Sequence, residues 1–373
     1  MNLESLSQSF EKLNKLLPAL GLIFSTLILL VGWVFYDINP LHMIKRIEAE
    51  QKGFDYAEQQ RQFQRTVVEN HLSLGYAFLD DRLYSQATSE FDKALGIDKL
   101  NEAAQIGRFI VEVADQIQND FRPQAIERQL HFLQQQQPDN PYVQVLYGDL
   151  AVQLDDNKKA IDYYDRATQS ERQPASAYFG LGYLFENQPQ PQLDHALKYY
   201  QKAVERSEWN QIYLNNLATV NRKLGHYQES IKQYEKILTL DRDYMLPNLG
   251  ISQSYALSGK FSMAINYQKQ LIMLMDQPSI ADQAKNKSPW NFHNTLLESM
   301  DEKRQYVLFS LGLSFFLLDQ KDDAQNYLQK ARAIKTDITA EIKAIVAQDI
   351  ELLVKKNTLY ETQAEQFKQQ YLK

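Results

Sequence analysis

The sequence predicts an all-α chain in which a helical solenoid of about six to seven helix pairs follows a single apolar helix. Small residues recur at fixed steps along most of the chain, and one segment near the start has 19 consecutive uncharged residues. Glycine is scarce, at 13 of 373 residues, as is typical of helical proteins. In a solenoid, each repeat packs on its neighbours and the core is continuous.

Residues 1–17 predict an amphipathic helix. Five apolar residues follow one another at steps of three and four, so they share one helix face: Leu3, Leu6, Phe10, Leu13 and Leu17. Such a face can lie on a membrane surface. Alternatively, this segment is a helical extension of the apolar segment that follows.

Residues 18–36, PALGLIFSTLILLVGWVFY, predict a transmembrane helix. A helix of this length crosses about 30 Å of hydrocarbon. Trp33 and Tyr36 lie at its far end, where interfacial aromatic residues are typical. The competing interpretation is a cleaved signal peptide, but the apolar run is too long and no small-x-small cleavage site follows it. We therefore expect the lipid bilayer to be a partner through residues 18–36.

The flanking charges indicate the orientation of this helix. Lys12 and Lys15 lie closer to the apolar segment than Lys45 and Arg46 do, and basic residues mark the cytoplasmic flank. We expect a single-pass protein of a bacterial inner membrane, with its repeats in the periplasm rather than the cytoplasm. Residues 37–67 are polar and helix-forming, so they predict a helical stalk with a break at Gly53.

Small residues then recur at steps of 12 and 7. The sets begin at Gly75, Gly148, Ala218, Ser252 and Gly312, and a set with steps of 14 and 7 begins at Gly182. Two antiparallel helices approach closely only where bulky side chains are missing, so these positions predict tight helix pairs. In four sets an aromatic residue follows the middle small residue by four positions: Phe91, Tyr164, Tyr200 and Tyr234. We interpret these rings as packing between helices.

This pattern resembles the tetratricopeptide repeat (TPR), a helix pair of 34 residues with small, aromatic and proline-ended positions. The resemblance covers about residues 68–337 and implies a right-handed solenoid with a concave groove. Units 1–6 span 68–278, with a degenerate second unit, and a last unit spans 305–337. The insertion 279–304 separates them and is too long for a tight turn.

The last unit begins with YVLFSLGLSFFLLDQ, which is apolar almost all round and should therefore be buried. Either the insertion and a capping helix cover it, or a partner does; we favour the internal cover. Residues 338–373 predict that capping helix, at 338–356, and a frayed polar tail.

Little in the sequence indicates chemistry. The chain has no cysteine, no histidine pair at metal-binding spacing, no phosphate-binding loop and no nucleophile elbow. Its net charge of −7 shows no basic stripe for nucleic acid. We expect no enzyme, no cofactor or metal, and no small-molecule substrate. Three acidic pairs are interpreted as turn formers and helix caps: Asp80–Asp81, Asp155–Asp156 and Asp322–Asp323.

Binding is the function that remains. By register with the family, the resemblance places nine residues on the groove: Tyr142, Asp149, Phe179, Tyr183, Glu186, Asn215, Thr219, Arg222 and Gln253. Aromatic and polar side chains suit a helix or an extended peptide from another protein. The lysine–asparagine pair with which some family members hold a peptide carboxylate is missing from these positions.

The sequence therefore predicts a membrane-anchored scaffold or assembly factor in envelope biogenesis, secretion or membrane-complex assembly. Two alternatives stay open. One is a permanent structural or accessory subunit of a large membrane complex, and the other is a regulator of a membrane enzyme.

Overall fold

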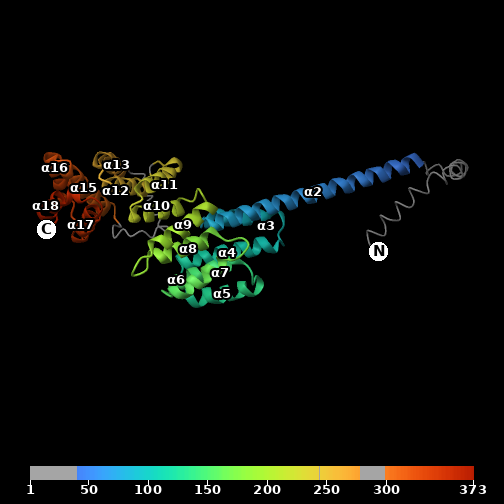
Figure 1. Cartoon of the computed structure of the whole chain (residues 1–373). Coiled ribbons are helices and arrows are strands. Elements are labelled where there is room, and N and C mark those ends of the chain that lie inside the picture. The colour runs from blue at the N-terminus through green and yellow to red at the C-terminus, as the bar shows by residue number, and fades with distance from the viewer. Residues whose placement is uncertain (1–39, 243, 278–298) are drawn as a thin grey trace, which may run out of the picture. The chain divides into compact units, whose positions relative to one another are not determined.

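The computed structural model describes residues 40–242, 244–277 and 299–373, and the regular secondary structure in these ranges is entirely helical (Figure 1). The all-α prediction is therefore confirmed for this part of the chain. No helix in these ranges is long and apolar enough to cross a membrane. The segments 1–17 and 18–36, and residues 279–298 of the insertion, lie outside the described residues.

The chain divides into two compact units, residues 1–70 and 71–373. Helix α2, Pro40–Asp80, begins in the first unit and ends in the second. In the first unit, the expected break at Gly53 is absent, because the helix continues through this residue. A glycine inside a helix costs only about 1 kcal/mol relative to alanine, which neighbouring helix-forming residues offset.

The second unit is a series of helix pairs in which the two helices pack on each other and most pairs pack on the next. Residues 71–80 of α2 begin it, followed by α3 (Tyr84–Ile97), α4 (Glu102–Asn119), α5 (Pro123–Gln136), α6 (Pro141–Gln153), α7 (Asn157–Thr168), α8 (Ala175–Glu186), α9 (Leu193–Arg206), α10 (Gln211–Leu224) and α11 (Tyr227–Leu240). The series continues with α12 (Met245–Leu257), α13 (Phe261–Met275), α15 (Met300–Leu317), α16 (Lys321–Ala333), α17 (Thr339–Lys356), a 3₁₀ turn (Thr358–Tyr360) and α18 (Glu361–Tyr371).

The turn between the helices of a pair has a recurring left-handed residue. In five pairs this residue lies seven positions after the small residue of the first helix: Arg82, Asp155, Gly225, Gly259 and Asp319. Glycine and aspartate accept a positive φ readily, but arginine does so rarely. Arg82 therefore needs tertiary contacts to hold its conformation.

The recurring aromatic rings fill a space that we call the ring slot. It lies between the first helix of one unit and the first helix of the next. Tyr164 of α7 fills the slot of the third unit, and a Cβ atom added at Gly148 or at Gly180 would lie 2.5 Å from its ring. A Cβ atom added at Gly75 would lie 2.7 Å from the ring of Phe91, and one added at Gly107 would lie 2.4 Å from it. The small residues are therefore needed where the ring meets the helix backbone.

The last unit is covered by the chain's own helices. Residues of α15 are buried almost continuously from Gln305 to Leu317, and α15 packs against α13, α16, α17 and α18. Phe316 of α15 meets Phe367 of α18 with ring centroids 5.5 Å apart. The tail was expected to be frayed, but Phe367 is fully buried because it closes the end of this core.

Candidate functional site

Three of the predicted groove residues bind the hydroxyl groups of ring-slot tyrosines. In each case the ring lies in the slot and its hydroxyl reaches a residue on the first helix of the same unit. The pairs are Tyr164–Asp149 (2.6 Å), Tyr200–Glu186 (2.8 Å) and Tyr234–Thr219 (2.8 Å). A buried hydroxyl needs a partner, so these predicted groove residues hold helices together.

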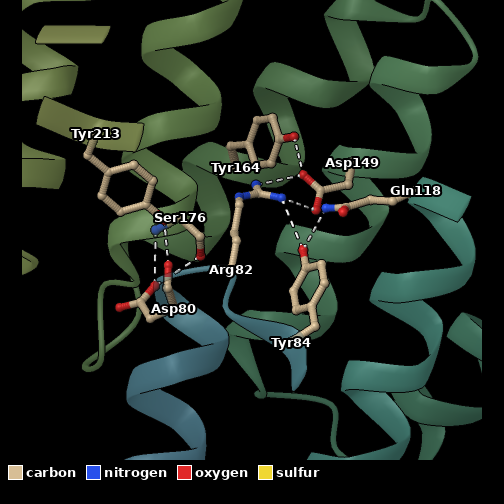
Figure 2. A network of polar contacts seen from close by, with 8 residues as sticks. All are labelled: Asp80, Arg82, Tyr84, Gln118, Asp149, Tyr164, Ser176 and Tyr213. Carbon is tan, nitrogen blue, oxygen red and sulfur yellow. Dashed lines mark hydrogen bonds and ion pairs between the residues drawn. The ribbon is translucent and has the colours of Figure 1, made fainter. Parts of the chain in front are cut away.

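Asp149 also forms a buried ion pair with Arg82 from the turn after α2. The Nη1 and Nη2 atoms of Arg82 each donate to one carboxylate oxygen over 2.9 Å, and both side chains are almost fully buried. Figure 2 shows Arg82 extending from the end of α2 towards Asp149, with Tyr84 nearby. Burial raises the pKa of Tyr84 to about 12, although Arg82 opposes the shift.

Asp80 caps a helix that lies far away in the sequence. Its carboxylate accepts hydrogen bonds from the backbone N–H groups of Ala175 and Ser176 and from the Ser176 hydroxyl, each over 3.0 Å (Figure 2). It therefore neutralises the positive end of α8. Burial raises the pKa of Asp80, and these hydrogen bonds lower it in part.

The same turn reaches α10. The Tyr213 hydroxyl donates to the backbone carbonyl of Asp80 over 2.5 Å, and the Asn210 side chain donates to the carbonyl of Asp81 over 3.0 Å. We call residues 80–82 the acidic turn. It contacts the first helices of the third, fourth and fifth units, so the chain fills part of the predicted groove with its own residues.

A second polar cluster lies nearer the C-terminus. Gln253 donates to the Tyr306 hydroxyl over 2.8 Å, and this hydroxyl donates to Asp349 of α17 over 2.6 Å. Burial raises the pKa of Asp349, while the Tyr306 hydrogen bond and the positive charge of Arg222 lower it in part. Helix α17 packs against the first helices α12 and α15, so it also occupies groove-side surface.

The structure divides the nine predicted groove residues into two sets. Five are buried inside the chain: Tyr142, Asp149, Phe179, Glu186 and Thr219. Four are half-buried and lie on the first helices of the fourth to sixth units: Tyr183, Asn215, Arg222 and Gln253. Contact of these nine residues with a partner stays a prediction.

Sequence reasoning missed Arg82 and the reach of Asp80. It interpreted Asp80–Asp81 as a local turn former, whereas Asp80 caps α8, 95 residues away. A signal was present in the sequence, because Arg82 stands where other units have glycine or aspartate. An unfavourable turn residue indicates a compensating contact elsewhere.

The clusters described above hold helices together. Among the residues that the structure describes, no group of three or more histidine or acidic side chains could hold a metal ion.

These consecutive helix hairpins define the chain as a helical-repeat solenoid. Two tetratricopeptide repeat family profiles match it, over residues 145–208 and 213–244. These residues therefore form tetratricopeptide repeats, and TPR arrays are scaffolds for interactions between proteins. This agrees with the resemblance found in the sequence.

Solved structures with related architecture include MamA, with 17% identity over 42% of this chain and 91% of that one, and a TM-score of 0.38. PilF of Pseudomonas aeruginosa has 16% identity over 60% of this chain and 99% of that one, with a TM-score of 0.39. An IFIT1 monomeric mutant has 13% identity over 91% of this chain and 78% of that one, with a TM-score of 0.44. Similarity at this level carries no functional inference. No curated protein sequence matches the chain significantly.

Proposed function

We propose that this protein is a membrane-anchored TPR scaffold that binds partner proteins at the groove of its fourth to sixth units. One observation carries the proposal: Tyr183, Asn215, Arg222 and Gln253 are half-buried groove residues on the consecutive first helices α8, α10 and α12. The acidic turn covers the groove nearer the N-terminus. Arginine and tyrosine are enriched among residues that dominate binding energy at interfaces.

Arg222 supports this location. Its Nε atom is buried and has no hydrogen-bond partner among the residues that the structure describes. An unsatisfied buried donor costs about 1 to 3 kcal/mol, and an acceptor from a partner would recover that cost. The neighbouring Lys223 is already paired with Glu186 over 2.8 Å.

The anchor is residues 18–36, with the repeats on the periplasmic side of a bacterial inner membrane. The uncharged length of this segment and the basic residues before it support the anchor and its orientation. A scaffold held at the membrane in this way would act in envelope biogenesis, secretion or assembly of membrane complexes.

Partner recovery from mild detergent tests the groove. We expect the double variant Tyr183→Ala/Arg222→Ala of the full chain to keep its melting temperature within a few degrees. It should recover at least about tenfold less partner, because a binding hot spot contributes about 2 kcal/mol. The matched control is Tyr163→Ala/Arg166→Ala, which removes the same residue types from α7. A folded groove variant that still recovers every partner would contradict the proposed site.

Membrane fractionation tests the anchor separately. We expect the full chain to remain in the membrane pellet after carbonate extraction. A soluble protein with the mass expected after cleavage near residue 36 would contradict the anchor. Recovery of one partner set at fixed stoichiometry under all conditions would favour a permanent subunit over a scaffold.

A further inference from the structure

The ring slot of the sixth unit differs from the others. Gln268 of α13 lies four residues after Ala264, at the position where four other units have an aromatic ring. Ser252 and Ser310 stand where Gly148 and Gly180 face Tyr164 in the third unit. A glutamine side chain is thinner than a tyrosine ring, so the slot is incompletely filled.

A cavity of about 30 Å³ remains there, lined by residues of α12, α13, α15 and α17. A water molecule needs about 10–15 Å³ measured in this way, so the cavity holds two or three groups of the size of water. The walls are mostly apolar and include four leucines: Leu249, Leu257, Leu313 and Leu353. The polar lining includes Gln253, Gln268, Tyr306 and Asp349.

Gln268 is an unsatisfied polar group in this lining. Its side chain belongs to a residue only 3% exposed, and its Oε1 atom has no hydrogen-bond partner in the described part of the chain. A buried acceptor without a partner costs about 1 to 3 kcal/mol. The cavity beside it therefore suits a group that donates hydrogen bonds.

Hydrogen-bond acceptors also remain among the other polar groups that line the cavity. The Ser252 and Ser314 hydroxyls donate to backbone carbonyls over 2.8 and 3.0 Å. Gln253 donates to Tyr306, and Tyr306 donates to the Oδ2 atom of Asp349. These four groups thus donate within the protein, and the Oε1 atom of Gln268 and the Oδ1 atom of Asp349 have no donor among the described residues.

We propose that this cavity binds the end of a primary alkylammonium group, supplied by a lysine side chain of a partner protein. The ammonium group is about the size of a water molecule, donates three hydrogen bonds and carries no acceptor. Its positive charge complements the carboxylate of Asp349. The positive charge of Arg222 on α10 also acts on this carboxylate. The alkyl stem lies along the leucine walls, as lysine stems do on apolar surfaces. Guanidinium groups and aromatic rings are too large for the cavity.

The lysine part of this proposal rests on the proposed scaffold function, but the amine part does not. The first probe is therefore n-butylammonium chloride, added to the purified full chain in mild detergent and followed by thermal melts. We expect a saturable rise of the melting temperature. Equal concentrations of three controls should not reproduce this rise. The first, n-butanol, tests the alkyl stem alone, n-butylguanidinium chloride tests a larger cationic head group, and sodium chloride tests ionic strength.

Two variants locate the effect. Gln268→Leu introduces the residue that the last unit has at this position, Leu328, and so fills the slot with a side chain that the fold already uses. Asp349→Asn removes the charge while keeping an acceptor for Tyr306. For each variant, the n-butylammonium concentration that gives half of the maximal rise in melting temperature should be at least tenfold higher than for wild type. The control Asp323→Asn, exposed on α16, should leave it unchanged. An unchanged response in folded Gln268→Leu, or an equal response to n-butanol, overturns the site.

The partner arm uses proteins recovered in the groove experiment. Acetylation of their lysines should reduce recovery by wild type at least tenfold, and recovery by Gln268→Leu should be low with or without acetylation. If acetylation has no effect while n-butylammonium binds, the lysine assignment is wrong and the amine site stands. If no partner is recovered at all, the scaffold function fails, and the n-butylammonium experiment still decides the site.

Discussion

The ring slots of the third and sixth units share one position in the repeat and differ in what fills it. In the third unit, Tyr164 lies against Gly148 and Gly180, and its hydroxyl binds Asp149, which is paired with Arg82. The two Nη atoms of Arg82, the carboxylate of Asp149 and the Tyr164 hydroxyl are paired with one another there. In the sixth unit, Gln268 leaves a cavity and its own Oε1 atom has no partner among the described residues.

With the proposed amine site, a packing position of the repeat becomes a binding position. The helix pair, its small residues and its turn are kept, so the backbone need not change. One side chain of the wrong shape for the slot opens a cavity. Local inconsistency of this kind, in a fold that is otherwise consistent, is expected at functional positions.

The largest effect should come from breaking the closed network of the third unit. Asp149→Ala removes the partner of a buried arginine and of a buried tyrosine hydroxyl, and should lower the free energy of unfolding by about 3 to 5 kcal/mol. Chemical denaturation followed by circular dichroism measures it. Asp162→Ala is the control, because its ion pair with Arg166 is solvent-exposed and worth at most about 1 kcal/mol. Equal losses in the two variants would contradict the buried network.

Tyr164→Gln places the sixth-unit side chain in the third-unit slot. The lost ring and the cavity left behind should cost about 3 kcal/mol. Gln268→Leu makes the opposite change and should raise the melting temperature or leave it unchanged, since it fills space that is already open. The comparison between the slots fails if Tyr164→Gln costs less than Gln268→Leu.

The close approach of helix backbone to ring is tested by Gly180→Ala. The added Cβ would lie 2.5 Å from Tyr164, so one of them must shift, at a cost of about 1 to 3 kcal/mol. Gly96→Ala in α3 is the matched control, because a Cβ there meets no atom within 4 Å. The control should stabilise the helix by up to about 1 kcal/mol. Thermal melts that rank the two variants in the opposite order would refute the slot geometry.

The smallest effect is the pH dependence of the sixth-unit cluster. Burial raises the folded-state pKa of Asp349, so its contribution to stability is complete below the unfolded-state value of about 3.9 and declines as pH rises through the folded-state value. Asp349→Asn does not titrate. The free energy of unfolding of this variant, relative to wild type, should therefore increase from pH 4 upwards. A relative stability that falls over this range would show that the carboxylate is favoured in its charged form.

Local spacing in the sequence was enough to predict the helix pairs. The steps of 12 and 7 mark the small residue where a ring meets the first helix of its own unit, as Gly148 and Tyr164 show. The contact of Tyr164 with the next first helix, at Gly180, lies outside these steps. The apolar periodicity after the last unit was likewise enough to predict a capping helix over 338–356, where α17 spans Thr339–Lys356. Both patterns depend on residues within one or two helices, so they can be read without knowing how distant units meet.

Only the tertiary structure decided what fills the groove. Arg82 reaches Asp149 across 67 residues, and Asp349 reaches Tyr306 across 43, so side chains from separate units meet. Register with the family placed Tyr142, Phe179 and Asp149 on the groove but gave no means of knowing that the acidic turn covers it. A repeat pattern specifies which face of a helix meets its neighbour in sequence. Which distant segment covers the opposite face depends on the summed geometry of all the units, and no local spacing records it.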